Sequence, residues 1–248
     1  ADGYATVEWI AKHPWSNGRI GTYGVSYPAA TQWLLAVEAP PHLRCIFPSM
    51  TFSSAREFFY FGGAFDMSWL PYLIQNIAPD IRRRLKLPDP PGTADRAGRD
   101  ALAKAALWHV PLNTVEALKD ACPFYFEWLD HPDDGDYWDY ANIEALYQKV
   151  TVPAFNFSGW HDEGYGPNGA VRNFLGARSK GATPRARAPR LMIGPWTHGG
   201  QTRTRFGERD FGPSAAIQYD ELVLDWSDLH LRDVDNAQFS KQPAVRVF

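Results

Sequence analysis

The chain has 248 residues, 45% of them hydrophobic and 21% charged, and its formal net charge is −3. This composition excludes a disordered chain and indicates a globular protein that can bury a sizeable core. Lysine and arginine are scattered, and the short run Arg82–Arg84 has no accompanying motif, so a solvated helix face is favoured over a nucleic-acid site. No apolar run is long enough to span a bilayer.

The first fifty residues predict a helix, a strand, a sharp turn and a second helix. Residues 6–11 have helical spacing of apolar side chains, and residues 19–23 form a short strand. A helix follows from Pro28 to Ala36, and residues 43–47 form a second short buried strand. We expect Cys45 and Cys122 to be buried free thiols, because neither lies in a pair or at metal-ligand spacing.

Residues 51–146 have a different pattern, aromatic and irregular, with helical spacing over residues 101–107 and 115–119. No alternating strand pattern occurs there, so the stretch predicts an inserted helical cap. Strand-like runs return at residues 150–157 and 190–193, and helical patterns cover 169–178 and 215–231. Strands that alternate with helices predict an α/β fold with a doubly wound parallel sheet.

We therefore expect four segments. They are a partial core (residues 1–50), the helical cap (51–146), more core (147–232), and a linker with the first strand of a missing β-domain (233–248). Both ends look cut, because the chain starts almost inside a helix and ends on an alternating strand with no later partner. We expect the N-terminus to be missing, and the sequence as given shows no signal peptide; the compartment is left open, with the cytoplasm favoured.

A candidate nucleophile lies in the turn between the predicted strand at residues 19–23 and the predicted helix that begins at Pro28. Gly24-Val25-Ser26-Tyr27-Pro28 has a small residue two positions before a serine, as a sharp strand-to-helix turn requires. Proline is favourable at a first helical position. The Tyr27 backbone N–H would then point to the place where an oxyanion forms.

A candidate acid and base follow later in the chain. The strand at residues 152–157 leads to Asp162, and the strand at 190–193 leads to His198. Asp162 could instead cap the following helix, and Glu163 and His161 compete for its role. The order serine, aspartate, histidine is that of the α/β-hydrolase fold. In it the imidazole takes the serine proton and the carboxylate orients the imidazole.

These residues resemble the CocE/NonD hydrolases, which include cocaine esterase, α-amino-acid ester hydrolases and X-Pro dipeptidyl-peptidases. The resemblance covers nearly the whole chain and rests on three ordered motifs: Gly24-Val25-Ser26-Tyr27, Gly159-Trp160-His161-Asp162, and Gly194-Pro195-Trp196-Thr197-His198. It implies an α/β-hydrolase core, a helical cap and a C-terminal jelly roll that would begin near Phe248. It also implies that Asp162 is the triad acid.

The resemblance implies a second oxyanion donor, a tyrosine hydroxyl from an early core loop, which no residue of this chain matches. Losing one such donor costs about 10²–10³ in rate, so the chain alone is expected to be impaired. Glu163 is the only acid directly after Asp162 and is not at the family spacing, which does not favour recognition of a substrate ammonium. We expect a substrate pocket containing Trp69, Trp160, His161 and Trp196. Ordinary helix packing is the alternative for Trp69.

The sequence thus predicts a serine hydrolase that cleaves an ester or amide acyl bond through an acyl-enzyme. The alternatives are an X-Pro dipeptidyl-peptidase, an acyl transferase acting on an amine, and a catalytically silent α/β binding domain. We expect no cofactor and no metal, because the acidic run at residues 133–139 lacks calcium-loop spacing. The expected partner is a small ester or amide, or a short peptide, and not nucleic acid or membrane; a homo-oligomer stays open.

Overall fold

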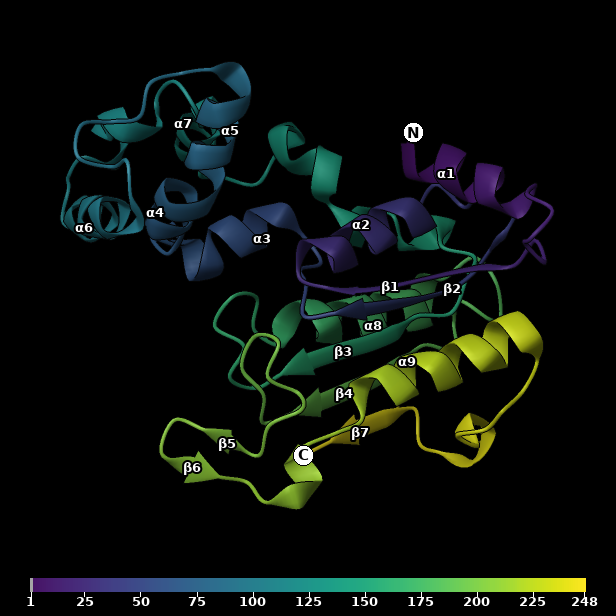
Figure 1. The fold of residues 1–248 in the computed structure, drawn as a ribbon. Helices are drawn as coiled ribbons and strands as arrows, with labels where there is room; N and C mark the ends of the chain where they lie inside the picture. Colours follow the sequence, from purple (N-terminus) through teal and green to yellow (C-terminus); the bar gives the residue numbers. More distant parts are fainter. Residues whose placement is uncertain (1) are drawn as a thin grey trace. The chain divides into compact units, whose positions relative to one another are not determined.

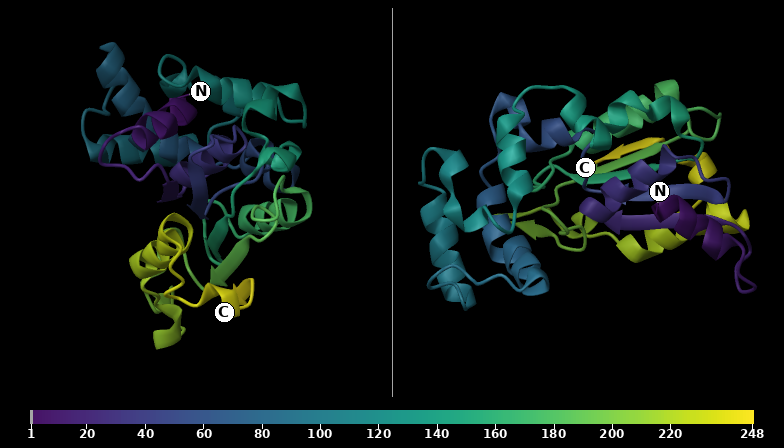
Figure 2. Two further views of the ribbon diagram at one scale, coloured as in Figure 1. Left: turned by 90° about the vertical axis from the view of Figure 1, so that its right-hand side faces the viewer. Right: turned by 90° about the horizontal axis from the view of Figure 1, so that it is seen from above.

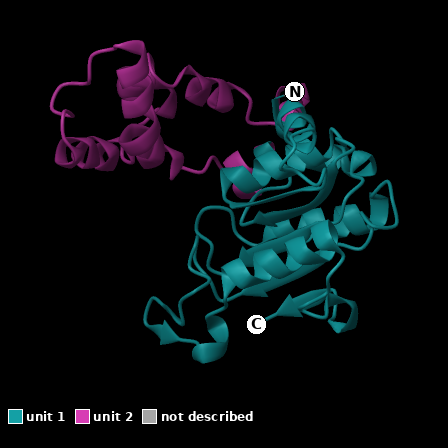
Figure 3. Cartoon of the chain, turned by 45° about the vertical axis from the view of Figure 1, so that its right-hand side comes forward, with its two compact units in different colours: residues 1–55, 141–248 teal, residues 56–140 magenta. Residues whose placement is uncertain are grey.

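The structure, a computed structural model, describes residues 2–248. These divide into two compact units (Figure 3). Unit 1 comprises residues 1–55 and 141–248, and unit 2 comprises residues 56–140. Unit 2 is therefore an insertion between two halves of unit 1.

Unit 1 is built on a five-stranded sheet in the order β1-β2-β3-β4-β7, with each neighbouring pair parallel (Figures 1 and 2). The strands are β1 Ile20–Val25, β2 Leu43–Ser49, β3 Phe155–Gly159, β4 Arg190–Gly194 and β7 Val245–Val247. A separate antiparallel ribbon joins β5 Arg205–Phe206 to β6 Arg209–Asp210. The predicted α/β class with a parallel sheet is confirmed.

Helices cover both faces of this sheet, as a doubly wound fold requires. On one face, α2 (Tyr27–Ala36) and α8 (Asn168–Lys180) bury a cluster that includes Trp33, Ile46 and Ala177. On the other face, α9 (Tyr219–Ser227) packs Trp226 on Phe155. The N-terminal α1 (Asp2–Ala11) packs beside α2 (Figure 1).

The end of the chain corrects one expectation. Residues 233–248 were expected to hold a linker and the first strand of a β-domain, yet Val245 and Val247 pair with Leu191 and Ile193 of β4, so this strand belongs to the core sheet. Sequence alternation marks a strand but does not say which sheet it joins, and here the open edge of β4 accepts it. The predicted helix at residues 215–231 is also divided, because a π-helical turn at Asp228–Arg232 follows α9.

Unit 2 contains helices and no strand among its residues. Its aromatic side chains form its core: Phe59 stacks on Trp128 with ring centroids 4.1 Å apart, and Trp69 lies 4.7 Å from Phe59. Tyr60 donates a hydrogen bond to the Trp128 carbonyl at 2.8 Å. The helices are α3 Ala55–Phe59, α4 Trp69–Tyr72, the π-helix Leu73–Ile77, α5 Ala78–Leu85, α6 Arg96–Ala106 and α7 Pro123–Asp130, with short 3-10 turns between them.

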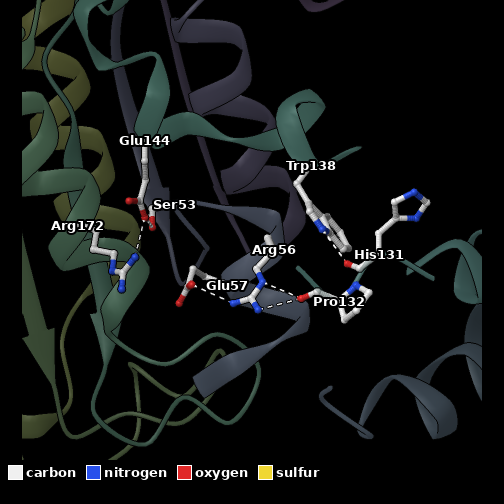
Figure 4. Close-up of polar contacts among 8 residues, drawn as sticks. All are labelled: Ser53, Arg56, Glu57, His131, Pro132, Trp138, Glu144 and Arg172. Atoms are coloured by element: carbon white, nitrogen blue, oxygen red, sulfur yellow. Dashed lines mark hydrogen bonds and ion pairs between the residues drawn. The ribbon is translucent and has the colours of Figure 1, made fainter. Parts of the chain in front are cut away.

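The chain leaves and re-enters unit 1 through two adjacent segments. The Ile143 N–H donates to the Ser53 carbonyl at 3.0 Å, and Ser53 Oγ donates to Glu144 at 2.6 Å. Arg172 of α8 holds the same carboxylate at 3.1 Å (Figure 4). Within unit 2, Arg56 donates two hydrogen bonds to the Pro132 carbonyl (Figure 4). Polar contacts thus join the two connecting segments within unit 1, and separate ones hold Arg56 within unit 2.

Both cysteines are free and buried, as expected from the sequence, and burial raises the pKa of the Cys45 thiol to about 12. Over residues 2–248, no helix has both the length and the apolar character needed to cross a membrane.

Candidate active site

Ser26 occupies a strained turn between β1 and α2. Its φ of 74° and ψ of −136° are unusual for a residue with a side chain, and such a conformation costs roughly 1–3 kcal/mol. Two hydrogen bonds hold it: the Ser26 N–H donates to the Ser49 carbonyl at 2.9 Å, and the Ala29 N–H donates to the Ser26 carbonyl at 2.9 Å. The fold therefore maintains a sharp strand-to-helix turn at this serine, as the sequence predicted.

The residues around Ser26 explain how the chain forms this turn. A Cβ atom on Gly24 would lie 2.9 Å from the Pro28 side chain, so the chain can double back only with glycine there. Buried Gln32 then links the helix to two strands, because its amide oxygen accepts from the Thr22 hydroxyl of β1 at 3.2 Å and from the Phe47 N–H of β2 at 3.0 Å. The Tyr27 N–H is at the start of α2, where helical amides have no intrahelical acceptor.

The loops after β3 and β4 are joined beyond the last ladder pair of the sheet. The Trp160 N–H donates to the Gly194 carbonyl at 2.8 Å, and the His161 N–H donates to the Trp196 carbonyl at 3.0 Å. A Cβ on Gly159 would lie 2.1 Å from the Trp196 carbonyl oxygen, so glycine is needed for this approach. The pairing brings the residues that follow, Asp162 and His198, next to each other.

Asp162 and His198 form a hydrogen-bonded pair. Asp162 Oδ1 lies 2.9 Å from His198 Nδ1. The Asp162 side chain is fully buried, whereas that of His198 is 28% exposed. The same Oδ1 accepts from the backbone N–H groups of Gly164 at 3.0 Å and Tyr165 at 3.1 Å. The carboxylate is therefore fixed by its own loop and binds the imidazole at Nδ1. The other ring nitrogen, Nε2, remains for another partner.

The environment of His198 raises its pKa above the ordinary 6.5. The hydrogen bond to Asp162 is the largest cause, burial of the ring opposes it, and the charges of Asp162 and Glu163 add to the rise. Glu163 also accepts the His198 backbone N–H at 3.0 Å. A base stabilised as its cation in this way suits proton transfer near neutral pH.

The Ser26 side chain has a partner that the sequence analysis did not anticipate. Ser26 Oγ donates to the Tyr165 hydroxyl at 3.4 Å, and within residues 2–248 it makes no hydrogen bond to His198. The Tyr165 ring stacks on the imidazole, with centroids 5.5 Å apart and planes inclined by 22°. Tyr165 thus lies between serine and histidine. Tyr165 follows Asp162 by three residues in a glycine-rich turn, and this position was the one sequence feature that could have placed it near the site.

The residues expected to line a pocket have different surroundings. Trp196 is buried, stacks on Phe157 at 4.6 Å and donates to the Ala215 carbonyl, so core packing accounts for it. Trp160 is half-exposed, and the His161 ring lies against Phe211 at 5.9 Å. Trp69 packs inside unit 2 against Phe58 and Phe59, which matches the helix-packing alternative. Within residues 2–248, no three His, Cys, Asp or Glu side chains gather as metal ligands would.

Residues 1–200 match the profile of the X-Pro dipeptidyl-peptidase (S15) family. The chain belongs to this family. Membership agrees with the strand-turn-helix at Ser26 and with the order of the motifs, and the resemblance to CocE/NonD hydrolases is confirmed.

Relatives of this S15-family chain are hydrolases by name. Cocaine esterase from Rhodococcus sp. (strain MB1 Bresler) is 28% identical over all of this chain and 43% of its own length. An aminopeptidase structure from a marine sediment archaeon (Thaumarchaeota) is 21% identical, with a TM-score of 0.74, over 100% of this chain and 40% of that one. A CocE/NonD family hydrolase from Staphylococcus aureus is 21% identical, with a TM-score of 0.59, over 99% of this chain and 34% of that one. The S15-family chain therefore spans less than half the length of these relatives.

Proposed function

We propose that this chain carries the catalytic core of a serine hydrolase that cleaves an ester or amide acyl bond. The observation that carries the proposal is the strained conformation of Ser26 at the carboxyl end of β1. The Asp162–His198 pair follows the carboxyl ends of β3 and β4. The register of the parallel strands supports this convergence, because Val25 pairs with Ser49, Ser49 with Phe157, and Gly159 with Gly194. Ligands bind beyond the carboxyl ends of such strands.

In the proposed mechanism, Ser26 Oγ attacks the carbonyl carbon as its proton passes to His198 Nε2. Asp162 stabilises the resulting imidazolium and keeps its Nδ1–H in place. The Tyr27 N–H donates to the negatively charged oxygen of the tetrahedral intermediate. His198 then returns the proton to the departing alcohol or amine, which leaves an acyl ester on Ser26. Water repeats the sequence, so that the acid is released and the serine proton is restored.

The test uses the complete protein and a fluorophosphonate, which reacts with activated serines. We expect labelling of the parent and none of Ser26→Ala, with Ser16→Ala as the control because Ser16 lies in the partly exposed loop before β1. Equal labelling of Ser26→Ala and the parent would overturn the nucleophile assignment. An unlabelled parent, with no burst of acyl-enzyme, would instead favour a catalytically silent binding domain.

A peptidase that releases X-Pro dipeptides is the second candidate, and the matched family profile supports it. Comparing kcat/KM for an acyl ester with that for an Ala-Pro anilide separates the two, because an esterase lacks subsites that reward the dipeptide. Addition of an amine nucleophile to the ester assay detects acyl transfer through a new amide product.

We further propose that unit 2 acts as the cap of this hydrolase, and that Trp160 and His161 contribute to its substrate pocket. Unit 2 is inserted between β2 and β3, in the chain that follows the carboxyl end of β2. Insertions that follow the carboxyl ends of strands commonly shape the substrate pocket of α/β enzymes. Trp160→Ala is expected to raise KM more than it lowers kcat, because the half-exposed ring can bind substrate without touching the reacting atoms.

A further inference from the structure

Tyr165 touches every member of the proposed triad. Its backbone N–H donates to Asp162 Oδ1 at 3.1 Å, its ring stacks on His198, and its hydroxyl oxygen accepts from Ser26 Oγ at 3.4 Å. A second aromatic ring also stacks with Tyr165: the centroids of the Phe52 and Tyr165 rings lie 6.3 Å apart, and their planes are inclined by only 24°. Phe52 is anchored in turn, since its carbonyl accepts from the Asn173 amide at 3.0 Å. Tyr165 is thus fixed at its backbone and along its ring.

The Ser26 hydroxyl has one proton to donate, so its donation to Tyr165 competes with donation to His198 Nε2. The 3.4 Å separation is long for an O–H···O hydrogen bond, so the bond from Ser26 to Tyr165 is weak. The ring of Tyr165 has a different effect, because it covers one face of the imidazole and limits how the ring can tilt.

We infer that Tyr165 is a positioning residue: its ring holds the His198 imidazole, and its hydroxyl oxygen is the acceptor that Ser26 must leave before attack. This assignment rests on the proposed function. The two roles belong to different atoms of one side chain, and substitution by phenylalanine or leucine separates them. Phenylalanine removes only the hydroxyl, whereas leucine also removes the aromatic face.

The first measurement is the rate constant of fluorophosphonate labelling in the complete protein. Tyr165→Phe is expected to label about two- to threefold faster, because a long hydrogen bond lies at the weak end of the usual range. Tyr165→Leu is expected to label more slowly than Tyr165→Phe by about tenfold, because no aromatic ring then restrains the orientation of the imidazole. Tyr23→Phe is the matched control: Tyr23 is exposed on β1, and its loss of a hydroxyl should change nothing.

The second measurement is the titration of His198 by NMR, which does not depend on activity. The charged groups that act on His198 are Asp162 and Glu163, and both remain in each variant. Burial of the imidazole opposes protonation, so Tyr165→Leu should raise the pKa of His198 further, whereas Tyr165→Phe should leave it unchanged. A merely structural role would not produce this difference between two folded variants.

Each outcome decides the matter. Labelling of Tyr165→Phe at or below the parent rate overturns the acceptor role of the hydroxyl. Identical His198 titrations in Tyr165→Phe and Tyr165→Leu overturn the role of the ring. If Ser26→Ala labels like the parent, the proposed function fails, and the titration still decides whether Tyr165 covers the imidazole.

Discussion

Replacing Asp162 by asparagine tests the proposed acid most directly. An amide oxygen can still accept from Gly164 and Tyr165, so the loop keeps its two backbone hydrogen bonds. The other carboxylate oxygen is buried without a partner, and an amide nitrogen there is equally unpaired. A buried polar group that newly loses its partner costs about 1–3 kcal/mol, and the free energy of unfolding should change by less than this.

Activity should respond far more strongly than stability. Asp162→Asn removes the carboxylate that fixes the imidazole tautomer and stabilises the imidazolium, and the same replacement in Ser-His-Asp enzymes lowers kcat by about 10⁴. We expect kcat/KM to fall by about 10³–10⁴, which corresponds to about 4–5.5 kcal/mol. The assay is steady-state ester hydrolysis by the complete protein, with urea unfolding measured alongside.

Glu163→Gln is the matched control, because Glu163 is the rival acid in the sequence. Its oxygen bonds the His198 backbone and not the ring, and an amide oxygen can keep that bond, so kcat/KM should fall by less than about tenfold. Near-parent activity of Asp162→Asn, or a larger loss in Glu163→Gln, would refute the assignment of the acid.

Three further predictions concern other parts of the site. His198 must be neutral to accept a proton, and its pKa is raised. We therefore expect kcat/KM to fall with decreasing pH around an inflection above 6.5. A flat pH profile of kcat/KM between about pH 5 and 8 would exclude His198 as the base. Gly24→Ala should lower the free energy of unfolding by about 1–3 kcal/mol and slow labelling of Ser26, since the new methyl meets Pro28; urea unfolding and labelling rates check this. Trp196→Phe should cost about 1–3 kcal/mol of stability by leaving the Ala215 carbonyl unbonded, and unchanged urea unfolding would contradict the core placement.

Much of the fold could be predicted from local pattern. The strand at residues 43–47 and the helix at 169–178 were located closely, because apolar spacing reports directly on which side chains are buried. The boundaries were less accurate where the apolar run was continuous. Residues 150–153 were expected in the strand yet precede β3, which begins at Phe155, and Ala154 makes only an isolated bridge to Ile46. Buried residues outside a regular ladder give the same sequence pattern as a strand.

The sequence by itself indicated the family and the chain order of Ser26, Asp162 and His198, because each of the three motifs places a polar side chain shortly after a glycine that a neighbouring group approaches closely. Only the tertiary structure decided that β7 joins the core sheet and that Trp196 is a core residue. It alone also placed Tyr165 against serine and histidine. The physical reason is that periodicity records whether a side chain is buried, whereas its partners depend on which segments, distant along the chain, the fold brings into contact.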